Sequence, residues 1–238
     1  MRSIRIATYN VHKCQGMDRR VRPDRIAAVL QEINADVIAL QEVLSIPGHR
    51  PEADQAGYLG AALQMHCVQA EARKLRGGIY GNVLLSRFPV DRHHHLDITR
   101  TGREERVILR ADVDVGADRV HVFNVHLGTG YFERRFQARV LKEHLLRTNG
   151  MEGHRLIMGD LNEWTRGLVT RTLSTEFRRV DLEVPFFRRR TYPALIPFLH
   201  LDYIYFDSTL RVRDAFFHTS RRALMASDHL PLVADMII

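Results

Sequence analysis

Short apolar runs that end in polar residues recur along the whole chain. Residues 155–158 begin with a charge and continue with three apolar residues, and Gly159 follows them. This pattern is typical of a buried strand that ends at a turn-tolerant glycine. Similar runs, several of them bounded by glycine or proline, predict further strands. Their ranges are 4–9, 36–40, 66–70, 82–86, 106–115, 119–125, 200–205, 211–217 and 232–238.

Apolar residues at helical spacing lie between several of these runs. Pro23 opens a segment in which Ile26, Val29, Leu30 and Ile33 recur three or four residues apart. This spacing predicts an amphipathic helix that begins at the proline. Further helices are expected within residues 47–64, 131–146 and 165–173.

Two polar side chains follow the apolar run at 155–158 almost directly. Because strand side chains alternate faces, Asp160 and Asn162 can point the same way if the extended geometry continues, with Leu161 turned into the core. A carboxylate there can orient and deprotonate a water, and a carboxamide can donate to an anionic oxygen. An Asx turn that closes the strand is the alternative reading of a lone Asp-x-Asn sequence.

Other predicted strands are flanked by groups that suit the same chemistry. Glu42 follows an apolar run, and Mg²⁺ commonly takes one or two carboxylates while it keeps positions for water and substrate phosphate. His126 ends another run, and Asp228 and His229 precede the last one. A histidine titrates near neutrality, so it can donate a hydrogen bond or a proton to a phosphate oxygen. A solvent-facing glutamate and a satisfied core histidine are the alternatives.

Composition adds a basic charge and little else. The formal net charge is +7, which suggests an anionic partner. Nearly all of the basic residues are arginines, a skew that genome composition produces as readily as binding does. Charge alone therefore does not decide whether the ligand is a nucleic acid. Cys14 and Cys67 are the only cysteines, too few for a disulfide framework or a thiolate metal site.

Organisation along the chain points to one domain. We find no linker, repeat or low-complexity run, so residues 1–238 are expected to form a single domain. No apolar run approaches the length that spans a bilayer, and the chain opens on a predicted strand instead of a signal peptide. A cytoplasmic location and a monomeric state are the corresponding expectations.

One predicted loop combines aromatic residues with arginines. Within residues 186–193, we take Arg188, Arg189, Arg190 and Tyr192 as candidates for substrate binding. Interleaved aromatic and guanidinium groups suit base stacking and phosphate contact, but they equally suit a substrate that is not a nucleic acid.

Two other basic stretches carry less information. Residues 73–78 are either a phosphate clamp or a solvated turn. His93, His94 and His95 are consecutive, and three adjacent strand residues cannot share one face, so we expect them on the surface and not around a metal ion.

Seven short motifs stand in a fixed order along the chain, each of them weak by itself. As an ordered set they resemble the endonuclease/exonuclease/phosphatase family, which includes deoxyribonuclease I, abasic-site endonucleases, neutral sphingomyelinases, inositol polyphosphate 5-phosphatases and deadenylases. The resemblance implies a four-layered α/β sandwich, of two mainly antiparallel sheets packed face to face with helices outside, and an active site at one end of the sheets. The motifs are Thr8-Tyr9-Asn10, Leu40-Gln41-Glu42, Gly81-Asn82-Val83-Leu84-Leu85-Ser86, Asn124-Val125-His126, Gly159-Asp160-Leu161-Asn162, Leu201-Asp202-Tyr203-Ile204 and Ser227-Asp228-His229-Leu230-Pro231.

The resemblance also implies a metal ion and a water nucleophile. Glu42 would be the chief ligand of Mg²⁺, or of Mn²⁺ in its place, with Asn10 and Asp228 near the ion. Asp160 would orient or deprotonate the attacking water, and Asn162 would hold water and phosphate in line. Phosphoryl transfer needs such a cation, placed donors and an oriented water more than it needs covalent chemistry.

The same resemblance assigns the remaining polar groups. His229, aligned by Asp202, and His126 would stabilise charge on the phosphoryl oxygens, and Asn82 would lie on the phosphate side. The chain lacks the paired cysteines of secreted deoxyribonucleases, is shorter than the inositol phosphatases, and offers no carboxylate that we can assign to His126. It looks most like small bacterial members of undefined substrate.

These observations lead to a Mg²⁺-dependent phosphodiester hydrolase as the main hypothesis. The basic loops favour a nuclease that acts on DNA or RNA. A phospholipid or other small phosphodiester, with a sphingomyelinase-like enzyme at an anionic membrane surface, is the alternative. A binding module that keeps the fold without the chemistry would be expected to lack ligand or base positions, and none is missing here.

Overall fold

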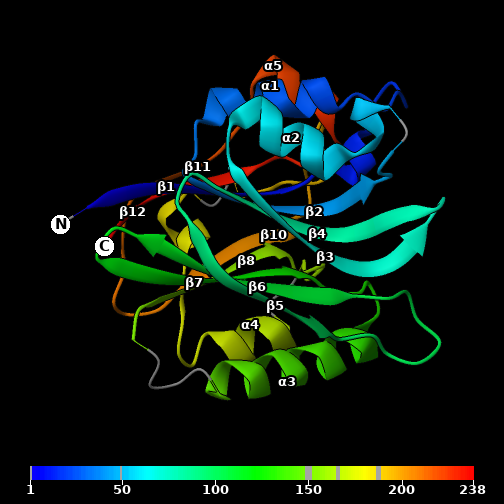
Figure 1. Ribbon diagram of the computed structural model, residues 1–238. Helices are drawn as coiled ribbons and strands as arrows, with labels where there is room; N and C mark the ends of the chain where they lie inside the picture. The colour runs from blue at the N-terminus through cyan, green and yellow to red at the C-terminus, as the bar shows by residue number, and fades with distance from the viewer. Residues whose placement is uncertain (1, 49, 148–151, 165–166, 186–188) are drawn as a thin grey trace.

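The protein is described here from a computed structural model. The described residues are 2–48, 50–147, 152–164, 167–185 and 189–238. Two six-stranded sheets pack face to face, and helices cover the outer face of each (Figure 1). This arrangement confirms the four-layered α/β sandwich expected from the sequence.

The first sheet combines strands from both ends of the chain, in the order β11-β12-β1-β2-β4-β3. Its outer face is covered by the helices α1, α2 and α5 (Figure 1). The strands are β1 (Ser3–Asn10), β2 (Val37–Ser45), β3 (His66–Leu75), β4 (Gly78–Ser86), β11 (Arg211–Phe217) and β12 (Leu232–Ile237). The helices are α1 (Pro23–Ile33), α2 (Gln55–Leu63) and α5 (Arg221–Ala226), with short 3₁₀ turns at η1 (His12–Cys14) and η2 (Pro51–Ala53).

The second sheet has the order β5-β6-β7-β8-β10-β9 and carries α3 and α4 on its outer face (Figure 1). Pairing is antiparallel except where β1 meets β2 in the first sheet and β7 meets β8 in the second. The strands are β5 (Val90–Asp97), β6 (Val107–Val115), β7 (Asp118–His126), β8 (His154–Asp160), β9 (Arg178–Arg179) and β10 (Asp202–Phe206). The helices are α3 (Tyr131–Arg147) and α4 (Leu168–Leu173), with a 3₁₀ turn at η3 (Val180–Glu183).

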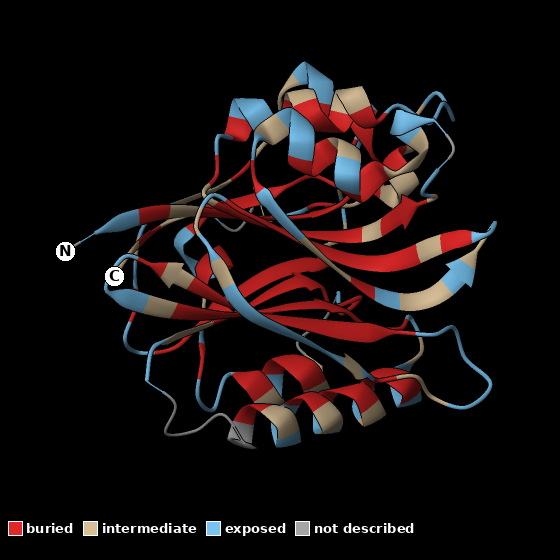
Figure 2. Ribbon diagram, in the orientation of Figure 1, coloured by how far each residue is buried: buried red, intermediate tan, exposed pale blue. Residues whose placement is uncertain are grey.

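Three apolar layers form the core. One lies between the sheets, and one lies under the helices on each outer face. The central strands are therefore buried on both faces, as Figure 2 shows, which is why they read in the sequence as nearly continuous apolar runs.

The period of two along the strands brings polar residues to the inner face at one end of the sandwich. Ile4 and Ile6 of β1 face the layer between the sheets, as do Leu156 and Met158 of β8. Counting on by two along these strands leads to Asn10 and Asp160 and, in β7, to His126. Because β1 and β8 end at the same side, Asn10 and Asp160 meet across the sheets.

Gly159 has a different role from the one expected. The strand predicted to end at this glycine continues through Asp160, where it pairs with β7 and with β10. Gly159 has a φ of 148°, and a Cβ built there would lie 1.8 Å from the carbonyl oxygen of Val125 in β7. The glycine is needed for this close approach of two backbones and not for a turn.

The segments that were expected to be superficial lie at sheet edges. His93, His94 and His95 lie in β5 and are exposed, which confirms that prediction. The basic residues at 73–78 join β3 to β4 as a hairpin. Among the described residues, no helix is long and apolar enough to cross a membrane.

A buried ion pair in the second sheet gives the fold an acid-sensitive element. Asp112 is 3% exposed, and its carboxylate accepts hydrogen bonds from both Nε and Nη2 of Arg110 at 3.0 Å. His121 Nδ1 lies 2.7 Å from the same group. Burial would raise the pKa of Asp112, but these hydrogen bonds hold it below its ordinary value of 3.8.

We expect Asp112→Asn to lower the free energy of unfolding by about 3 kcal/mol at neutral pH, because breaking a buried pair leaves the other charge desolvated. The folded-state pKa is depressed, so this contribution is complete above the ordinary pKa and is lost as pH falls through the folded value. Urea unfolding at neutral pH and below pH 3.8 should therefore show the gap between parent and variant shrinking in acid. Asp118→Asn, at an exposed carboxylate, is the control. An equal gap at both pH values would contradict the assignment.

Candidate active site

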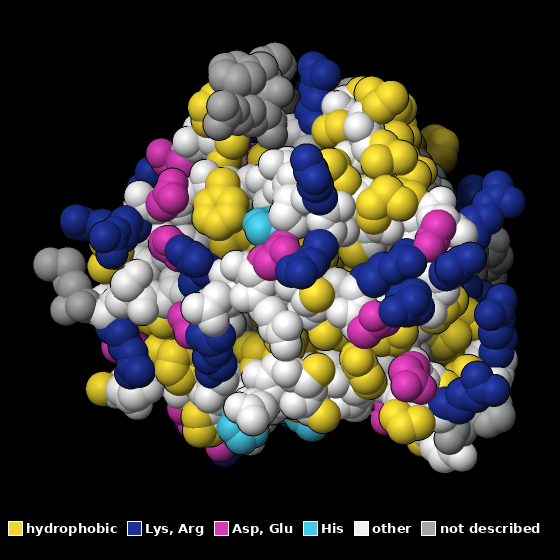
Figure 3. Space-filling model, turned by 90° about the horizontal axis from the view of Figure 1, so that it is seen from above, with side chains coloured by type: hydrophobic (Ala, Val, Ile, Leu, Met, Phe, Trp, Pro, Cys, Tyr) yellow, Lys and Arg dark blue, Asp and Glu magenta, His cyan; other side chains and the backbone are white. Residues whose placement is uncertain are grey.

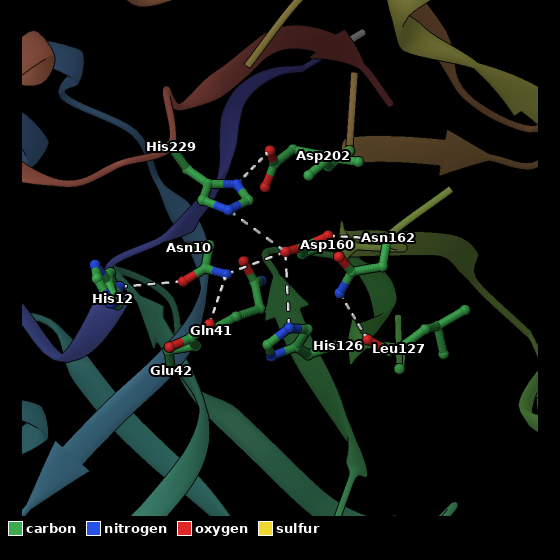
Figure 4. A network of polar contacts seen from close by, with 12 residues as sticks. Asn10, His12, Gln41, Glu42, His126, Leu127, Asp160, Asn162, Asp202 and His229 are labelled. Carbon is green, nitrogen blue, oxygen red and sulfur yellow. Dashed lines mark hydrogen bonds and ion pairs between the residues drawn. The ribbon is translucent and has the colours of Figure 1, made fainter. Parts of the chain in front are cut away.

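Asp160 is the centre of a polar cluster at the end of the sandwich (Figure 4). It is 2% exposed, and its Oδ2 accepts a hydrogen bond of 3.1 Å from Asn10 Nδ2. The Nε2 atoms of His126 and His229 each lie 3.7 Å from the same oxygen. Burial is the largest influence on this carboxyl and, with the charge of Asp202, raises its pKa above the usual range.

The backbone turns immediately after Asp160. Asn162 has a φ of 50°, and its N–H donates to Asp160 Oδ1 at 2.9 Å, so the Asx turn considered from the sequence is present. The side-chain Nδ2 of Asn162 donates to the carbonyl of Leu127 at 2.8 Å. The extended geometry therefore does not continue through Asn162, although Leu161 is buried as expected. The turn fixes one oxygen of Asp160 and leaves the other toward the histidines.

His229 is held in its charged form by a buried carboxylate. Its Nδ1 lies 2.9 Å from Oδ2 of Asp202, which is fully buried. Burial would lower the pKa of His229, but the charge and hydrogen bond of Asp202, with Asp160 nearby, raise it to about 10. Nδ1–H donates to Asp202, so Nε2–H is directed at Asp160 (Figure 4).

His126 has the opposite electrostatic surroundings. Its Nδ1 lies 3.1 Å from Nη1 of Arg106, which is 7% exposed and also donates to Glu104. Burial first, and the charge of Arg106 second, lower the pKa of His126 well below its usual value. A guanidinium can only donate, so the neutral ring accepts at Nδ1 and carries its proton on Nε2, facing Asp160. Arg106 thus occupies the place where a carboxylate partner had been sought.

Glu42 lies at a bulge in β2, opposite β4. Its φ of 58° is uncommon for a residue with a side chain. At this bulge, neighbouring Gln41 and Glu42 contact different partners, Asn124 and Asn10. Glu42 Oε1 accepts from Asn10 Nδ2 at 3.2 Å, and Oε2 lies 2.8 Å from Lys13 Nζ. Burial would raise the pKa of Glu42, but the charge and hydrogen bond of Lys13, with the hydrogen bond from Asn10, hold it well below its usual range.

These donors suit a hard divalent cation. The carboxylates of Glu42 and Asp160 converge on one amide group of Asn10, and a carboxylate oxygen of Asp202 lies within 4.8 Å of one of Asp160. Lys13 already places a positive charge on Glu42. In addition, Asp202 Oδ1 is buried without a hydrogen-bond partner among the described residues. Oxygen donors that crowd negative charge in a buried place are the kind of set that binds Mg²⁺.

The other predicted site residues lie around this cluster or below it. Asp228 is partly exposed, and its Oδ1 lies 3.4 Å from His12 Nδ1. Asn82 is only 2% exposed. Its Nδ2 donates to the carbonyls of Val107 at 2.8 Å and Asn124 at 3.2 Å. The amide of Asn82 therefore joins β4 to the opposite sheet.

The predicted substrate loop is only partly described. Tyr192 lies against His229, with ring centroids 4.9 Å apart. Arg189 donates to the carbonyls of Val184 and Leu182, and Arg190 is exposed. Arg188 lies outside the described residues.

Sequence reasoning missed the residues that control the charges of this cluster. Arg106 was read only as the first residue of a strand, Lys13 was given no role, and Gln41 was named only within the Leu40-Gln41-Glu42 motif. The one available signal was indirect, since a histidine without an assignable carboxylate invites a search for another polar partner.

Comparisons with known proteins identify the family and the fold of this chain. A model described as the Endonuclease/Exonuclease/phosphatase family matches residues 7–229. The uncharacterized protein YbhP of Escherichia coli strain K12 is 27% identical, over 98% of this chain and 96% of that protein. A functionally unknown conserved protein from Enterococcus faecalis V583 superposes with a TM-score of 0.80 at 23% identity, over 98% of this chain and 99% of that one. The mannosyl-6-phosphatase Bt3783 of Bacteroides thetaiotaomicron gives 0.81 at 15% identity, over 99% and 100%. At these identities the two structures show a shared fold.

We expect the two histidines to differ in charge at neutral pH, with His229 protonated and His126 neutral with its proton on Nε2. Imidazole ¹⁵N NMR of the protein in chelator should show this difference directly. Asp202→Asn should move the pKa of His229 down, since the carboxylate that raises it is removed. The signals of His121, which contacts a different carboxylate, are the internal control. A His229 ring that is neutral in the parent at pH 7 would contradict this description.

Proposed function

The chain belongs to the endonuclease/exonuclease/phosphatase family, whose members are metal-dependent phosphoric ester hydrolases, and we propose that it cleaves phosphodiesters by in-line attack of water. The observation that supports this most is the meeting of Asp160 with His126 and His229, each 3.7 Å away, beside the Glu42 carboxylate. We also propose that residues 1–238 form one such domain.

We assign Mg²⁺ as the ion, with Mn²⁺ as the alternative. Glu42 would hold it, with Asn10 and Asp228 near it, as the resemblance implies. A bound divalent cation would neutralise charge on the phosphate oxygens. The Lys13 ammonium on Glu42 supports a cation-attracting position there.

Asp160 is the proposed base for the attacking water. Its raised pKa suits proton transfer near neutral pH, because a general base works best when its pKa is close to the operating pH. Asn162 holds Asp160 in position through its backbone N–H, a hydrogen bond of 2.9 Å.

The histidines supply donors of two kinds. The charged Nε2–H of His229 stabilises negative charge on the phosphoryl oxygens and can protonate the leaving oxygen, with Asp202 holding the ring. The neutral Nε2–H of His126 donates a second hydrogen bond, and Arg106 keeps the proton on that nitrogen. A phosphate contact for Asn82 stays a prediction.

Glu42→Gln and His229→Ala should each lower kcat for a chromogenic phosphodiester by about 10²-fold or more, because each removes a group that acts on developing charge. Chelation should abolish parent activity, and Mg²⁺ should restore it. Mg²⁺ should also raise the melting temperature of the parent and not that of Glu42→Gln, since a ligand stabilises only the state that binds it.

Glu52→Gln makes the same chemical change at an exposed position and is the matched control. Circular dichroism should show that all variants fold. Folded variants with the kcat of the parent would refute the proposed mechanism.

For the substrate, the sequence favours a nuclease, and the structure adds a specific reason to consider a second class. On the face shown in Figure 3, basic side chains are spread among acidic ones and do not form a single track. Apolar side chains lie exposed on the loop that carries Tyr192, with Ile196 at 77% exposure. A phosphodiester with an apolar part, such as a phospholipid, is therefore the second candidate.

If the substrate is DNA or RNA, affinity should fall steeply as salt is added, because binding releases counterions from the phosphate backbone. Filter binding and cleavage of single-stranded and double-stranded DNA and of RNA over a salt series would measure this. The same salt series with phosphatidylglycerol and with sphingomyelin would measure binding and cleavage of phospholipids, the second candidate class of substrate. Nucleic-acid binding that does not change with salt would argue against the nuclease.

A further inference from the structure

A short hairpin beside the candidate active site has an apolar sequence and exposes three of its large apolar residues. Thr191 and Tyr192 pair with Leu199, through backbone hydrogen bonds of 2.8 to 3.1 Å. Between them the sequence reads Pro-Ala-Leu-Ile-Pro-Phe. Leu195, Ile196 and Phe198 are 51%, 77% and 60% exposed. Single exposed apolar residues are ordinary on protein surfaces, but such a cluster marks an interaction site.

The apolar surface continues beyond the hairpin and acquires positive charge there. Phe198 lines a cavity of about 270 Å³ together with Trp164 and Leu182, which are 51% and 48% exposed. Arg189 and Arg190 line the same cavity. Exposed aliphatic and aromatic side chains bordered by arginines match the interface of an anionic bilayer, where tryptophan and arginine place their polar ends at the headgroups.

The hairpin is attached firmly to the segment that carries the catalytic histidine. Ala194 N–H donates to the carbonyl of Asp228 at 2.8 Å, and Leu230 N–H donates to that of Thr191 at 2.9 Å. Tyr192 contacts the ring of His229. Anything that binds to the hairpin is therefore held next to the candidate active site.

We propose that the hairpin at 192–199 docks this protein on the surface of an anionic phospholipid membrane. The tip would enter the headgroup boundary, with the arginines of the adjoining cavity against lipid phosphates and a net charge of +7 drawing the protein to the surface. Delivery of a lipid phosphodiester to the site follows only if the proposed function also holds, whereas membrane binding does not depend on it.

Other occupants fit the hairpin less well. Residues 191–199 contain no basic side chain to hold a phosphate backbone. Phe198 offers one exposed ring, but Leu195 and Ile196 are aliphatic, so the tip suits an acyl phase better than a run of stacked bases. Stable protein partners bury about 800 Å² on each side with complementary shape, far more than a six-residue tip offers. A fluid bilayer needs no such complementarity.

The test is co-sedimentation with vesicles of phosphatidylcholine alone and of phosphatidylcholine mixed with phosphatidylglycerol, at low and high salt. We expect the parent to bind the anionic vesicles, less at high salt, and Ile196→Asp to bind them about tenfold more weakly, since it loses apolar insertion and adds a repelled charge. Leu195→Asp should behave in the same way. Val21→Asp places the same charge at a residue that is 50% exposed on another part of the surface and should bind like the parent.

Hydrolysis of a soluble phosphodiester by Ile196→Asp should match that of the parent, which keeps docking separate from catalysis. If neither protein hydrolyses it but only the parent binds vesicles, the proposed function fails and the docking surface stands. Equal vesicle binding by parent and Ile196→Asp, or no binding by the parent, overturns the docking surface. Concentration-dependent dimers on gel filtration that Ile196→Asp abolishes, without vesicle binding, would assign the hairpin to self-association instead.

Discussion

A layer of buried amides ties the two sheets together directly beneath the candidate site. Asn124 of β7 donates to the carbonyls of Leu40 and Val83 in the other sheet, at 2.9 and 2.8 Å. Gln41 donates to Asn124 Oδ1 at 2.8 Å, and Asn82 donates back across the interface. A buried amide without its partner loses about 1 to 3 kcal/mol. The sheets therefore cannot slide, and side chains from both stay in register.

Burial above this layer determines the charges of the site. Asp202 and Asp160 are almost inaccessible to water, so each neighbouring charge acts through a medium that screens it poorly. That is why the carboxylate of Asp202 raises the pKa of His229, while burial first and the guanidinium of Arg106 second lower the pKa of His126. Two chemically identical side chains at 3.7 Å from one oxygen thus become different donors.

Backbone hydrogen bonds join the exposed hairpin to a segment of the candidate site. The segment that supplies Asp228 and His229 hydrogen-bonds to Thr191 and Ala194 at the base of the hairpin. This attachment is the basis of the proposal that the hairpin docks on an anionic membrane, to which the basic net charge would draw the protein.

The sequence by itself determined all of the strands except β5 and β9, and with them most of the polar residues that meet at the site. Alternation along a strand is local, so the inner-face positions of Asn10 and Asp160 follow from the pattern alone. Which residue lies opposite is decided only when the sheets pack. The amide layer through Asn124 joins the two sheets across segments whose separation in sequence carries no information about distance, and the place of Gly159 against Val125 is decided by the pairing of β7 with β8. Tertiary structure therefore decided the protonation states, because burial and partners, and not residue type, set them.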